Sequence, residues 1–544
     1  MKPLIPLLVS GLAAAALTPS ILAQEFTAIS KSTAGAVGDD VAGEARISGD
    51  GRYVVFASKA SNLVAGDANG FYDIFLRDTV LGTTIRVSNG MAGAETNQES
   101  RWPEISEDGA YVLFSSSASN IVSGDTNAAA DLFLYTVATA AVERVSLTNW
   151  GTEAGAGVQV DQNLYDLSDD GRYIVFTSSS DDWVSILTSN ASRNVYLRDR
   201  TAGTTTLVSY KLGDASSAGG YAPSISGDGS TVAFVSTFWL LHPDDTDTFE
   251  DVFLFTTSTG VVSLASYNLA GIASGAFGNS TYPILTPDGR FLAFESTCAD
   301  LAIEDTNFDS DIYLRDLTTG VTEVVSFDRH GAIESLSWAK NVDISADGRY
   351  LTFSGHLKTD APTAPLSQNL YIRDRTSGTT ALINHPRWWF PSIIFKAWGP
   401  QVTDSGDGVV IVDGIGTAEE GDTPYSQVNH IALEAGVGTM SAITYGDAFV
   451  GWPLEITVHD GPASAPVYVL YSGSATGFTY AGHSFDIGAP VTLLGTTTTD
   501  ADGNAFWSVP SVPPSAAGRT IQIEVASTSG GIWCDSNRME VSIL

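Results

Sequence analysis

Four short acidic segments of this 544-residue chain have the residue types and spacing of a cation site. Each reads Asp-x-[Asn/Asp]-x-x-x-Asp, so that oxygen ligands alternate along a tight loop, and calcium takes six to eight such oxygens. The four sets are Asp67, Asn69 and Asp73; Asp125, Asn127 and Asp131; Asp245, Asp247 and Asp251; and Asp305, Asn307 and Asp311. The full calcium-loop spacing with its terminal glutamate is absent, and the same side chains could instead hold their loops as Asx-turns. Calcium is the one cofactor that the sequence indicates, and both interpretations stay open.

Aromatic residues provide the second chemical signal. Eight tryptophans precede residue 400, and none falls in an expected repeat strand or in an Asp-Gly turn. Aromatic platforms beside carboxylates suit sugars or peptides, although a tryptophan in a loop can also cover its own loop. Trp183 aligns with Leu63 and is expected to pack beneath its loop. The expected ligand-binding residues are Trp102, Tyr221, Tyr282, Trp338, Trp388, Trp389 and Trp398.

Signals for catalysis are weak, and no catalytic residue is predicted. The chain contains neither Gly-x-Ser-x-Gly nor His-Glu-x-x-His, which mark two common hydrolase mechanisms. Its seven histidines show no metal-ligand spacing. Three of them, His242, His330 and His385, lie like the tryptophans in connections between the expected repeat units. They would be the candidate catalytic residues if the chain were a polysaccharide-acting enzyme.

A repeated element must position these loops. The segment ISGDGRYVVF recurs as ISEDGAYVLF, LSDDGRYIVF, ISGDGSTVAF, LTPDGRFLAF, ISADGRYLTF and VTDSGDGVVIV. The turn glycines of the seven copies are Gly51, Gly109, Gly171, Gly229, Gly289, Gly348 and Gly408. Each repeat continues with a third strand such as DIFLRD and a fourth such as TTIRVS, which predicts a four-stranded antiparallel unit. The second strands are apolar on both faces, so both faces must be covered, as they are in a β-propeller.

The N-terminal segment indicates how the array closes. Residues 26–31 match the fourth strand of a repeat rather than the first. If they complete the last blade, the first and last edges of the array pair with each other, and neither is left exposed. The sequence therefore predicts an all-β chain with a seven-bladed propeller.

The motif [IL]-[ST]-x-D-G-[RK]-x-[ILV]-x-F, followed by D-[IV]-[FY]-[LI]-R-D, resembles the TolB-type, WD-like propeller repeats of secreted and periplasmic bacterial proteins. The resemblance covers residues 24–437. It implies the fold more than the function, because such propellers serve as binding platforms, as substrate gates of peptidases and occasionally as lyases.

A second domain is expected over residues 438–544, where the 60-residue period stops. New strands such as LEITVH, VYVLYS and TIQIEVA are separated by turns rich in proline and glycine. Their number and spacing fit a small β-sandwich, and the segment resembles the immunoglobulin-like C-terminal modules of bacterial surface and secreted proteins.

Composition limits the partners and the compartment. Residues 1–23 read as a secretory signal peptide, which predicts an exported protein of the periplasm, the cell surface or the extracellular medium. No later segment is apolar enough to span a membrane. A formal net charge of −36 argues against nucleic-acid binding through phosphates. The two cysteines, Cys298 and Cys534, could pair after export, but the sequence does not bring them together.

These observations favour an exported, non-enzymatic binding protein. One face of the propeller carries the loops after the second strands and the connections from each fourth strand to the next blade, and we call it the connection face. This face would recognise an extracellular glycan or a surface protein, and the second domain would act as a spacer or attachment module. The alternatives are a polysaccharide lyase or hydrolase with its site in the propeller funnel, and a structural protein of the cell envelope. The sequence does not indicate the ligand or the oligomeric state.

Overall fold

The computed structural model describes the chain from residue 22 to residue 435 with gaps, and beyond that it describes strands by their backbone. The gaps are residues 162, 186–192, 212–215, 240, 270, 272–277, 304, 306–308, 328–335, 358–368, 384–399, 407 and 414–426. Side chains are described only between residues 28 and 410. One compact unit is Gln24–Leu433, and Glu434–Leu544 belong to another.

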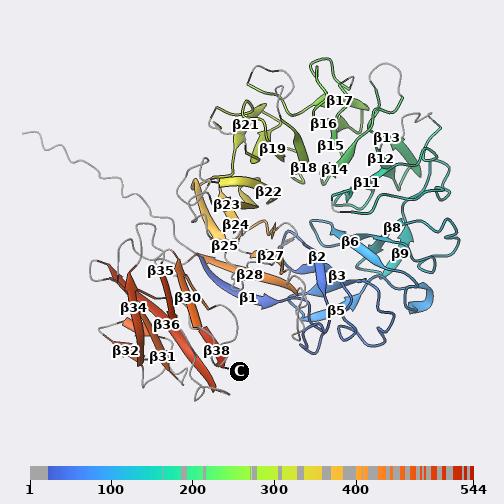
Figure 1. The fold of residues 1–544 in the computed structure, drawn as a ribbon. Coiled ribbons are helices and arrows are strands. Elements are labelled where there is room, and N and C mark those ends of the chain that lie inside the picture. Colours follow the sequence, from blue (N-terminus) through green and yellow to red (C-terminus); the bar gives the residue numbers. More distant parts are fainter. Residues whose placement is uncertain are drawn as a thin grey trace, which may run out of the picture. The chain divides into compact units, whose positions relative to one another are not determined.

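The first unit is a β-propeller in which the described residues form six blades, each built from four consecutive antiparallel strands (Figure 1). The first blade comprises β2 (Ala42–Ile47), β3 (Tyr53–Ser58), β4 (Asp73–Asp78) and β5 (Thr83–Arg86). The second comprises β6 (Ser100–Ile105), β7 (Tyr111–Ser116), β8 (Asp131–Thr136) and β9 (Ala141–Arg144). The third comprises β10 (Tyr165–Leu167), β11 (Tyr173–Ser178), β12 (Asn194–Asp199) and β13 (Thr204–Leu207).

The next three blades repeat this order. The fourth comprises β14 (Tyr221–Ile225), β15 (Thr231–Ser236), β16 (Asp251–Thr256) and β17 (Val261–Leu264). The fifth comprises β18 (Ser280–Leu285), β19 (Phe291–Ser296), β20 (Asp311–Asp316) and β21 (Val321–Val324). The sixth comprises β22 (Leu336–Ile344), β23 (Tyr350–Leu357), β24 (Asn369–Asp374) and β25 (Thr379–Ile383).

Another four-stranded sheet joins the two ends of this unit, and we call it the closing sheet. Its strand order is β1-β28-β27-β26, from β1 (Leu22–Ala28), β26 (Gln401–Val402), β27 (Gly408–Asp413) and β28 (Gln427–Ala435). The amide of Val402 donates to Asp343 Oδ2 of the sixth blade at 2.8 Å. The amide of Asp404 donates to the Gly49 carbonyl of the first blade at 3.0 Å. The closing sheet therefore contacts the first and the sixth blade, and it differs from the six blades in taking its outer strand from the N-terminal segment.

The second unit is also built from strands. Its elements are β29 (Ser441–Thr444), β30 (Leu454–His459), β31 (Pro466–Ser472), β32 (Phe478–Tyr480), β33 (His483–Phe485), β34 (Thr492–Thr498), β35 (Ala505–Val509), β36 (Arg519–Ser529), β37 (Ile532–Asp535) and β38 (Met539–Ile543). One sheet has the order β29-β30-β35, a second has the order β34-β31-β36-β37 with β38 on β36, and β32 pairs with β33.

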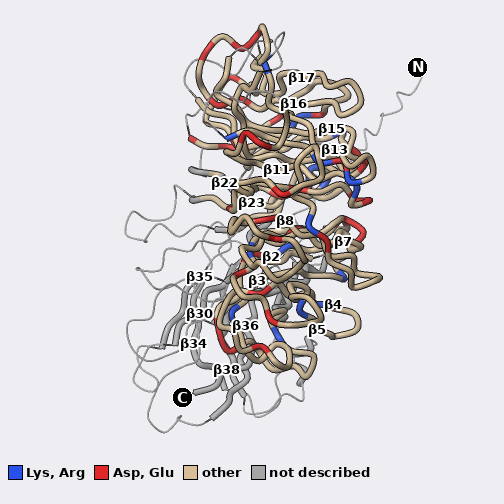
Figure 2. The backbone as a smooth tube through the Cα atoms, turned by 90° about the vertical axis from the view of Figure 1, so that its right-hand side faces the viewer, with Lys and Arg blue, Asp and Glu red and all other residues tan. Residues whose placement is uncertain are grey.

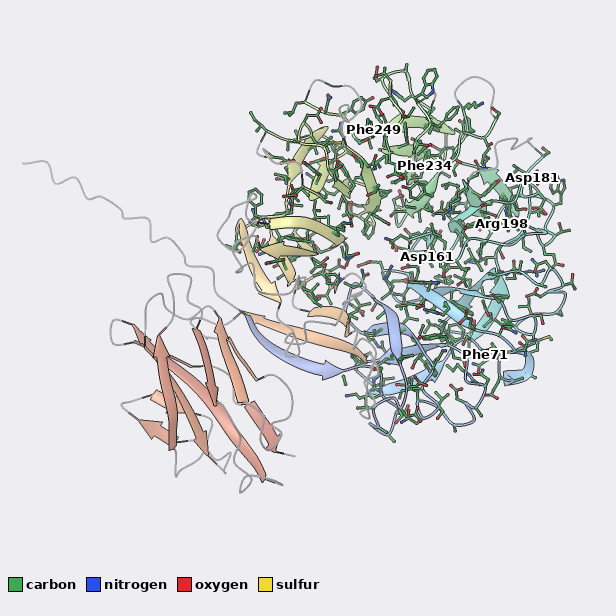
Figure 3. All side chains as sticks on the ribbon, in the orientation of Figure 1. Phe71, Asp161, Asp181, Arg198, Phe234 and Phe249 are labelled. Atoms are coloured by element: carbon green, nitrogen blue, oxygen red, sulfur yellow. The ribbon has the colours of Figure 1, made fainter. Side chains whose placement is uncertain are left out.

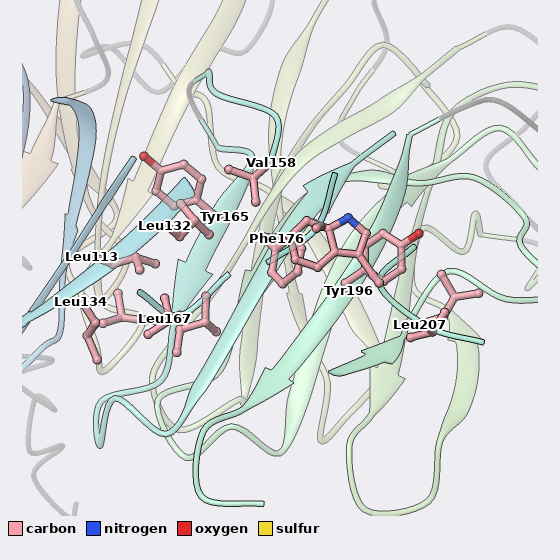
Figure 4. Close-up of a cluster of buried hydrophobic side chains, with 14 residues drawn as sticks. Leu113, Leu132, Leu134, Val158, Tyr165, Leu167, Phe176, Tyr196 and Leu207 are labelled. Carbon is pink, nitrogen blue, oxygen red and sulfur yellow. The ribbon is translucent and has the colours of Figure 1, made fainter. Parts of the chain in front are cut away.

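Stacked aromatic pairs form the centre of each blade. The fourth residue of each second strand is a phenylalanine, which stacks on a phenylalanine or tyrosine of the third strand at centroid distances of 5.5–5.8 Å in six blades. In the third blade this pair is Phe176 and Tyr196 (Figure 4). The ring of Trp183 lies against both of them. Trp183 is fully buried, which confirms the expectation that it packs beneath its loop.

Each Asp-Gly turn also receives a side chain from the preceding blade. Gly229 has a φ of +70°, and a Cβ at this position would lie 2.2 Å from Cδ2 of Tyr173. The same contact joins Gly109 to Tyr53, Gly171 to Tyr111 and Gly348 to Phe291. Glycine is therefore needed at these turns for two reasons. It adopts the positive φ without strain, and it has no Cβ to collide with the neighbouring ring.

Helix is almost absent from the described part of the chain, where the structure has one 3₁₀ turn, η1 (Met91–Gly93). No described helix is long and apolar enough to cross a membrane. Acidic residues, red in Figure 2, are spread along the described propeller.

Candidate functional site

A central cavity of about 370 Å³ is the clearest candidate site in the described part of the propeller. The first strand of every blade and of the closing sheet contributes a residue from the same register position to its wall. We call these seven residues the inner ring: Arg46, Glu104, Asp166, Ser224, Ile284, Asp343 and Gln401. Each directly precedes an apolar residue that packs into the blade. Because successive side chains of a strand point in opposite directions, the inner-ring residue points toward the propeller axis.

The inner ring also connects neighbouring blades. Asp166 Oδ2 accepts a hydrogen bond of 2.9 Å from the amide of Ile225, one blade further along. Ser224 Oγ accepts a 3.1 Å hydrogen bond from the amide of Leu285. Asp343 accepts the equivalent hydrogen bond from the amide of Val402 in the closing sheet. These side chains therefore hold the innermost strands together, and a structural role accompanies any role in binding.

The cavity is strongly acidic. Seven carboxylates line it against two cationic side chains, Arg46 and Lys340. The carboxylates are Glu104, Glu107, Asp161, Asp166, Asp169, Glu295 and Asp343. Arg46 is already paired with one of them, because its Nε lies 2.7 Å from Glu104 Oε2. Asp161 lies toward the centre of the ring in Figure 3, whereas Asp181 lies at its periphery.

Burial disfavours the ionised form of several of these carboxyl groups. It raises the pKa of Glu295 to about 7, although the carboxylate accepts a 2.6 Å hydrogen bond from the amide of Asn341. Burial, and after it the charge of Glu104, raises the pKa of Asp166 to about 7. Burial also raises the pKa of Asp343 to about 6, against the opposing effect of Arg46. A cation in the cavity would stabilise the charged form of all three groups.

A carboxyl pair lies at the Asp-Gly end of the cavity. Burial, and then the hydrogen bond and charge of Asp404, raise the pKa of Glu107 far above its usual range. Gly49 makes room for the pair, since a Cβ there would lie 1.7 Å from Glu107 Oε1 and 2.5 Å from Asp404 Oδ2. The raised pKa means that Glu107 keeps its proton at neutral pH and can act as an acid in this part of the cavity.

Backbone strain marks the innermost strands. Six blades each have, within the first strand or just before it, a non-glycine residue with φ between 48° and 56°: Glu44, Trp102, Asn163, Ala222, Tyr282 and Asn341. In five blades this residue lies within a β-bulge, seen as a shift in register between the first and second strands. Bulges re-aim side chains and are frequent beside functional sites. Asn163, Tyr282 and Asn341 line the cavity.

The structure places three of the seven expected aromatic residues in detail. Tyr282 is 43% exposed and lines the central cavity. The hydroxyl of Tyr221 donates to Glu250, and Tyr221 lines a second cavity of about 810 Å³ with Arg193 and Phe238. Trp102 is half-buried against the core between the second and third blades, and its amide donates to Glu44 Oε2 at 2.7 Å. These three rings therefore lie in three different surroundings.

The strand positions of the tryptophans differ from the expectation. Trp102 lies within β6 and Trp338 within β22, not in connections, because the bulges lengthen the innermost strands toward the preceding loop. The side chain of Trp338 is outside the described residues, as are Trp388, Trp389 and Trp398. Their role in a binding surface stays a prediction.

The acidic loops contain Asx-turns, in which an Asn or Asp side chain accepts a hydrogen bond from the amide two residues further on. Asn69 Oδ1 accepts from the amide of Phe71 at 2.9 Å, and Asp247 Oδ1 accepts from the amide of Phe249 at 2.8 Å. In the first blade, Arg86 Nη1 lies 3.7 Å from Asp67 and 3.4 Å from Asp73. Burial raises the pKa of Asp67 to about 6 despite this guanidinium. Asn307 of the fifth blade lies outside the described residues.

The chain matches no protein-family model and no curated protein. It is similar to the solved structure of a TolB from Agrobacterium tumefaciens, at 17% identity over 55% of this chain and 83% of that one, with a TM-score of 0.34. It is similar to prolyl endopeptidase at 12% identity over 78% of this chain and 56% of that one, with a TM-score of 0.45. It is similar to Trypanosoma rangeli sialidase at 9% identity over 94% of this chain and 88% of that one, with a TM-score of 0.30. These likenesses are too distant to carry function, and a propeller serves binding proteins and enzymes alike.

Proposed function

We propose that the chain is an exported, non-enzymatic binding protein whose central cavity receives a positively charged segment of a surface protein. The observation that carries this proposal is the lining of the cavity, where seven carboxylates face two cations and one of those cations is already paired. A guanidinium or ammonium group entering the cavity would compensate carboxylates that burial otherwise penalises.

The aromatic residues support the same class of ligand. Tyr282 is partly exposed beside Glu295 and Lys340 in the cavity wall. A cation over such a ring gains a further attraction, which is stronger where water is excluded. Trp338, Trp388, Trp389 and Trp398 remain predicted contacts of the partner protein, or of a glycan, on the connection face.

The rest of the architecture fits this role. We propose that the closing sheet is a seventh blade and that its outer strand closes the ring. We further propose that β29–β38 form an immunoglobulin-like sandwich, which acts as a spacer or attachment module. A closed ring would hold the inner-ring side chains at fixed positions around the axis, as a preorganised site requires.

A polysaccharide-acting enzyme is the second candidate, and the carboxyl pair of Glu107 and Asp404 favours it. The hydrogen bond from Asp404 helps Glu107 to keep its proton, and a carboxyl group that is protonated at neutral pH is what the general acid of glycoside hydrolysis requires. Turnover of a polysaccharide panel by the full chain, lost in Glu107→Gln, would establish this candidate in place of the binding protein.

The binding proposal is tested with a labelled peptide of sequence Gly-Arg-Arg-Gly and a matched peptide carrying citrulline in place of arginine. Citrulline preserves the shape and removes the charge. Fluorescence anisotropy of the full chain should show saturable 1:1 binding of the arginine peptide and at least tenfold weaker binding of the citrulline peptide, as expected for the loss of about 1.4 kcal/mol or more. Equal affinities would contradict the proposal, and saturable binding of a neutral oligosaccharide instead would assign the site to a glycan.

A further inference from the structure

The acidic loops that follow the second strands contain buried carboxylates, and three blades neutralise or hydrogen-bond them from within. In the first blade, the last residue of β5 is Arg86, whose Nη1 lies 3.4–3.8 Å from Asp67, Asp73 and Glu95. In the second blade the equivalent residue of β9 is Arg144. Its Nη1 lies 3.6 Å from Asp125, 3.5 Å from Asp131 and 2.8 Å from Glu153. A guanidinium therefore occupies the point where the carboxylates converge.

The fifth blade uses a different partner. The position of the arginine is occupied by Val324, which pairs with Tyr313 across the third and fourth strands. The hydroxyl of Tyr313 donates to Asp305 Oδ2, so that this buried carboxylate has a donor from the third strand.

The fourth blade has neither partner. Leu264 stands at the arginine position, and it pairs with Phe253, which stands at the tyrosine position. The loop nevertheless keeps all three carboxylates, on Asp245, Asp247 and Asp251. The arginine and the tyrosine that serve the other loops have both been replaced by apolar side chains.

Asp245 shows the consequence. It is only 3% exposed, its Oδ1 accepts a 3.3 Å hydrogen bond from the amide of Asp247, and its buried Oδ2 has no hydrogen-bond partner among the described residues. A buried carboxylate oxygen without a donor is costly, so an external partner is expected.

The geometry of the loop favours a metal ion as that partner. Asp245, Asp247 and Asp251 each place one carboxylate oxygen within 4.8 Å of the other two. Asp251 is held by Ser266, whose hydroxyl donates at 2.5 Å, whereas Asp247 is partly exposed and leaves a route from solvent. Three oxygens on a short loop, completed by backbone carbonyls or water, suit Ca²⁺ better than Mg²⁺, which demands near-ideal octahedral geometry.

We propose that the loop of the fourth blade binds one calcium ion through Asp245, Asp247 and Asp251, in the place that arginine side chains fill in the first two blades. The site lies in a loop outside the central cavity and is independent of the proposed binding function.

The test is calcium titration of the full chain by calorimetry, with melting curves in excess calcium and in chelator. We expect one site, with magnesium binding more weakly. At a free calcium concentration 100 times the Kd, Tm should rise by about 3 °C for a unit of this size, because the ion binds only the folded state. The absence of both a binding heat and a Tm shift in the wild-type protein would overturn the proposal.

Variants separate this loop from the other acidic loops. Asp245→Asn and the more exposed Asp247→Asn should each lose the calcium response, whereas Asp244→Asn, an adjacent carboxylate outside the cluster, should keep it. Leu264→Arg should supply the internal cation and abolish calcium binding. Unchanged calcium affinity in Asp247→Asn, or in folded Leu264→Arg, would contradict the proposal.

Discussion

Replacing Glu295 by glutamine should stabilise the protein at alkaline pH and have a much smaller effect at acidic pH. The glutamate is 5% exposed, and burial raises its pKa to about 7 from an ordinary value of 4.5. The folded state therefore retains a proton that the unfolded state has released, and the stability that this group contributes falls as pH rises from about 4.5 to about 7. Glutamine keeps the acceptor for the Asn341 amide and has no proton to lose.

The size of the effect follows from the two pKa values. Their separation corresponds to about 3 kcal/mol, which is the cost of keeping Glu295 ionised in the folded state at pH 8. At pH 5 the same calculation leaves about 1 kcal/mol. Glu295→Gln should thus be more stable than the wild-type protein by about 3 kcal/mol at pH 8 and by about 1 kcal/mol at pH 5.

Denaturant unfolding at pH 5, 6, 7 and 8 measures this difference. The control is Asp181→Asn, which removes a carboxylate from an exposed loop position and should follow the wild-type profile at every pH. Parallel profiles of Glu295→Gln and the wild-type protein would refute the argument that burial in the cavity penalises this charge. A stabilising variant would mean that the chain keeps a costly carboxylate, as binding sites often do.

Two further predictions concern the fold. Gly229→Ala should destabilise the protein more than Gly203→Ala. Both glycines have φ near +70°, but only a Cβ at Gly229 meets the Tyr173 ring, whereas Gly203 has nothing within 4 Å. We expect about 1 kcal/mol for Gly203→Ala and at least about 2 kcal/mol for Gly229→Ala by denaturant unfolding, and equal losses would contradict the packing argument. A chain beginning at residue 36 lacks β1 and should melt at a lower temperature or aggregate, because β28 then has a free edge. An unchanged Tm would contradict closure by the N-terminal strand.

The repeat and the strand order could be predicted because local signals agree in six of the seven copies. In these six, the Asp-Gly turn, the doubly apolar second strand and its phenylalanine recur at a nearly fixed period, and they form four-stranded sheets of consecutive strands. The seventh copy lacks the phenylalanine, and its turn glycine is Gly406 rather than the expected Gly408. The burial of Trp183 followed from its alignment with an apolar position. Such features depend on neighbours in sequence, so a single chain is enough to reveal them.

The central cavity was missed because it is built from residues about 60 positions apart. Glu104, Asp166 and Asp343 stand between apolar residues in otherwise similar strands, and a comparison of this one position across the repeats would have found them. The same comparison would have separated Arg86 from Leu264. The bulges left no such signal, because Trp102, Ala222 and Tyr282 are not residues that favour positive φ.

The most direct measurement compares two doubly neutralised variants for affinity toward the arginine peptide. At pH 8, where the two cavity carboxyl groups are mostly ionised, Asp166→Asn with Glu295→Gln removes two charges from the cavity, and Glu99→Gln with Asp181→Asn removes two from the exposed surface, so that the two variants have nearly the same net charge. If the cavity is the binding site, the first variant should bind at least about tenfold more weakly than the wild-type protein while the second binds as the wild-type protein does. Equal weakening of the two variants would show that the peptide responds only to the overall negative charge, and would contradict recognition in the cavity.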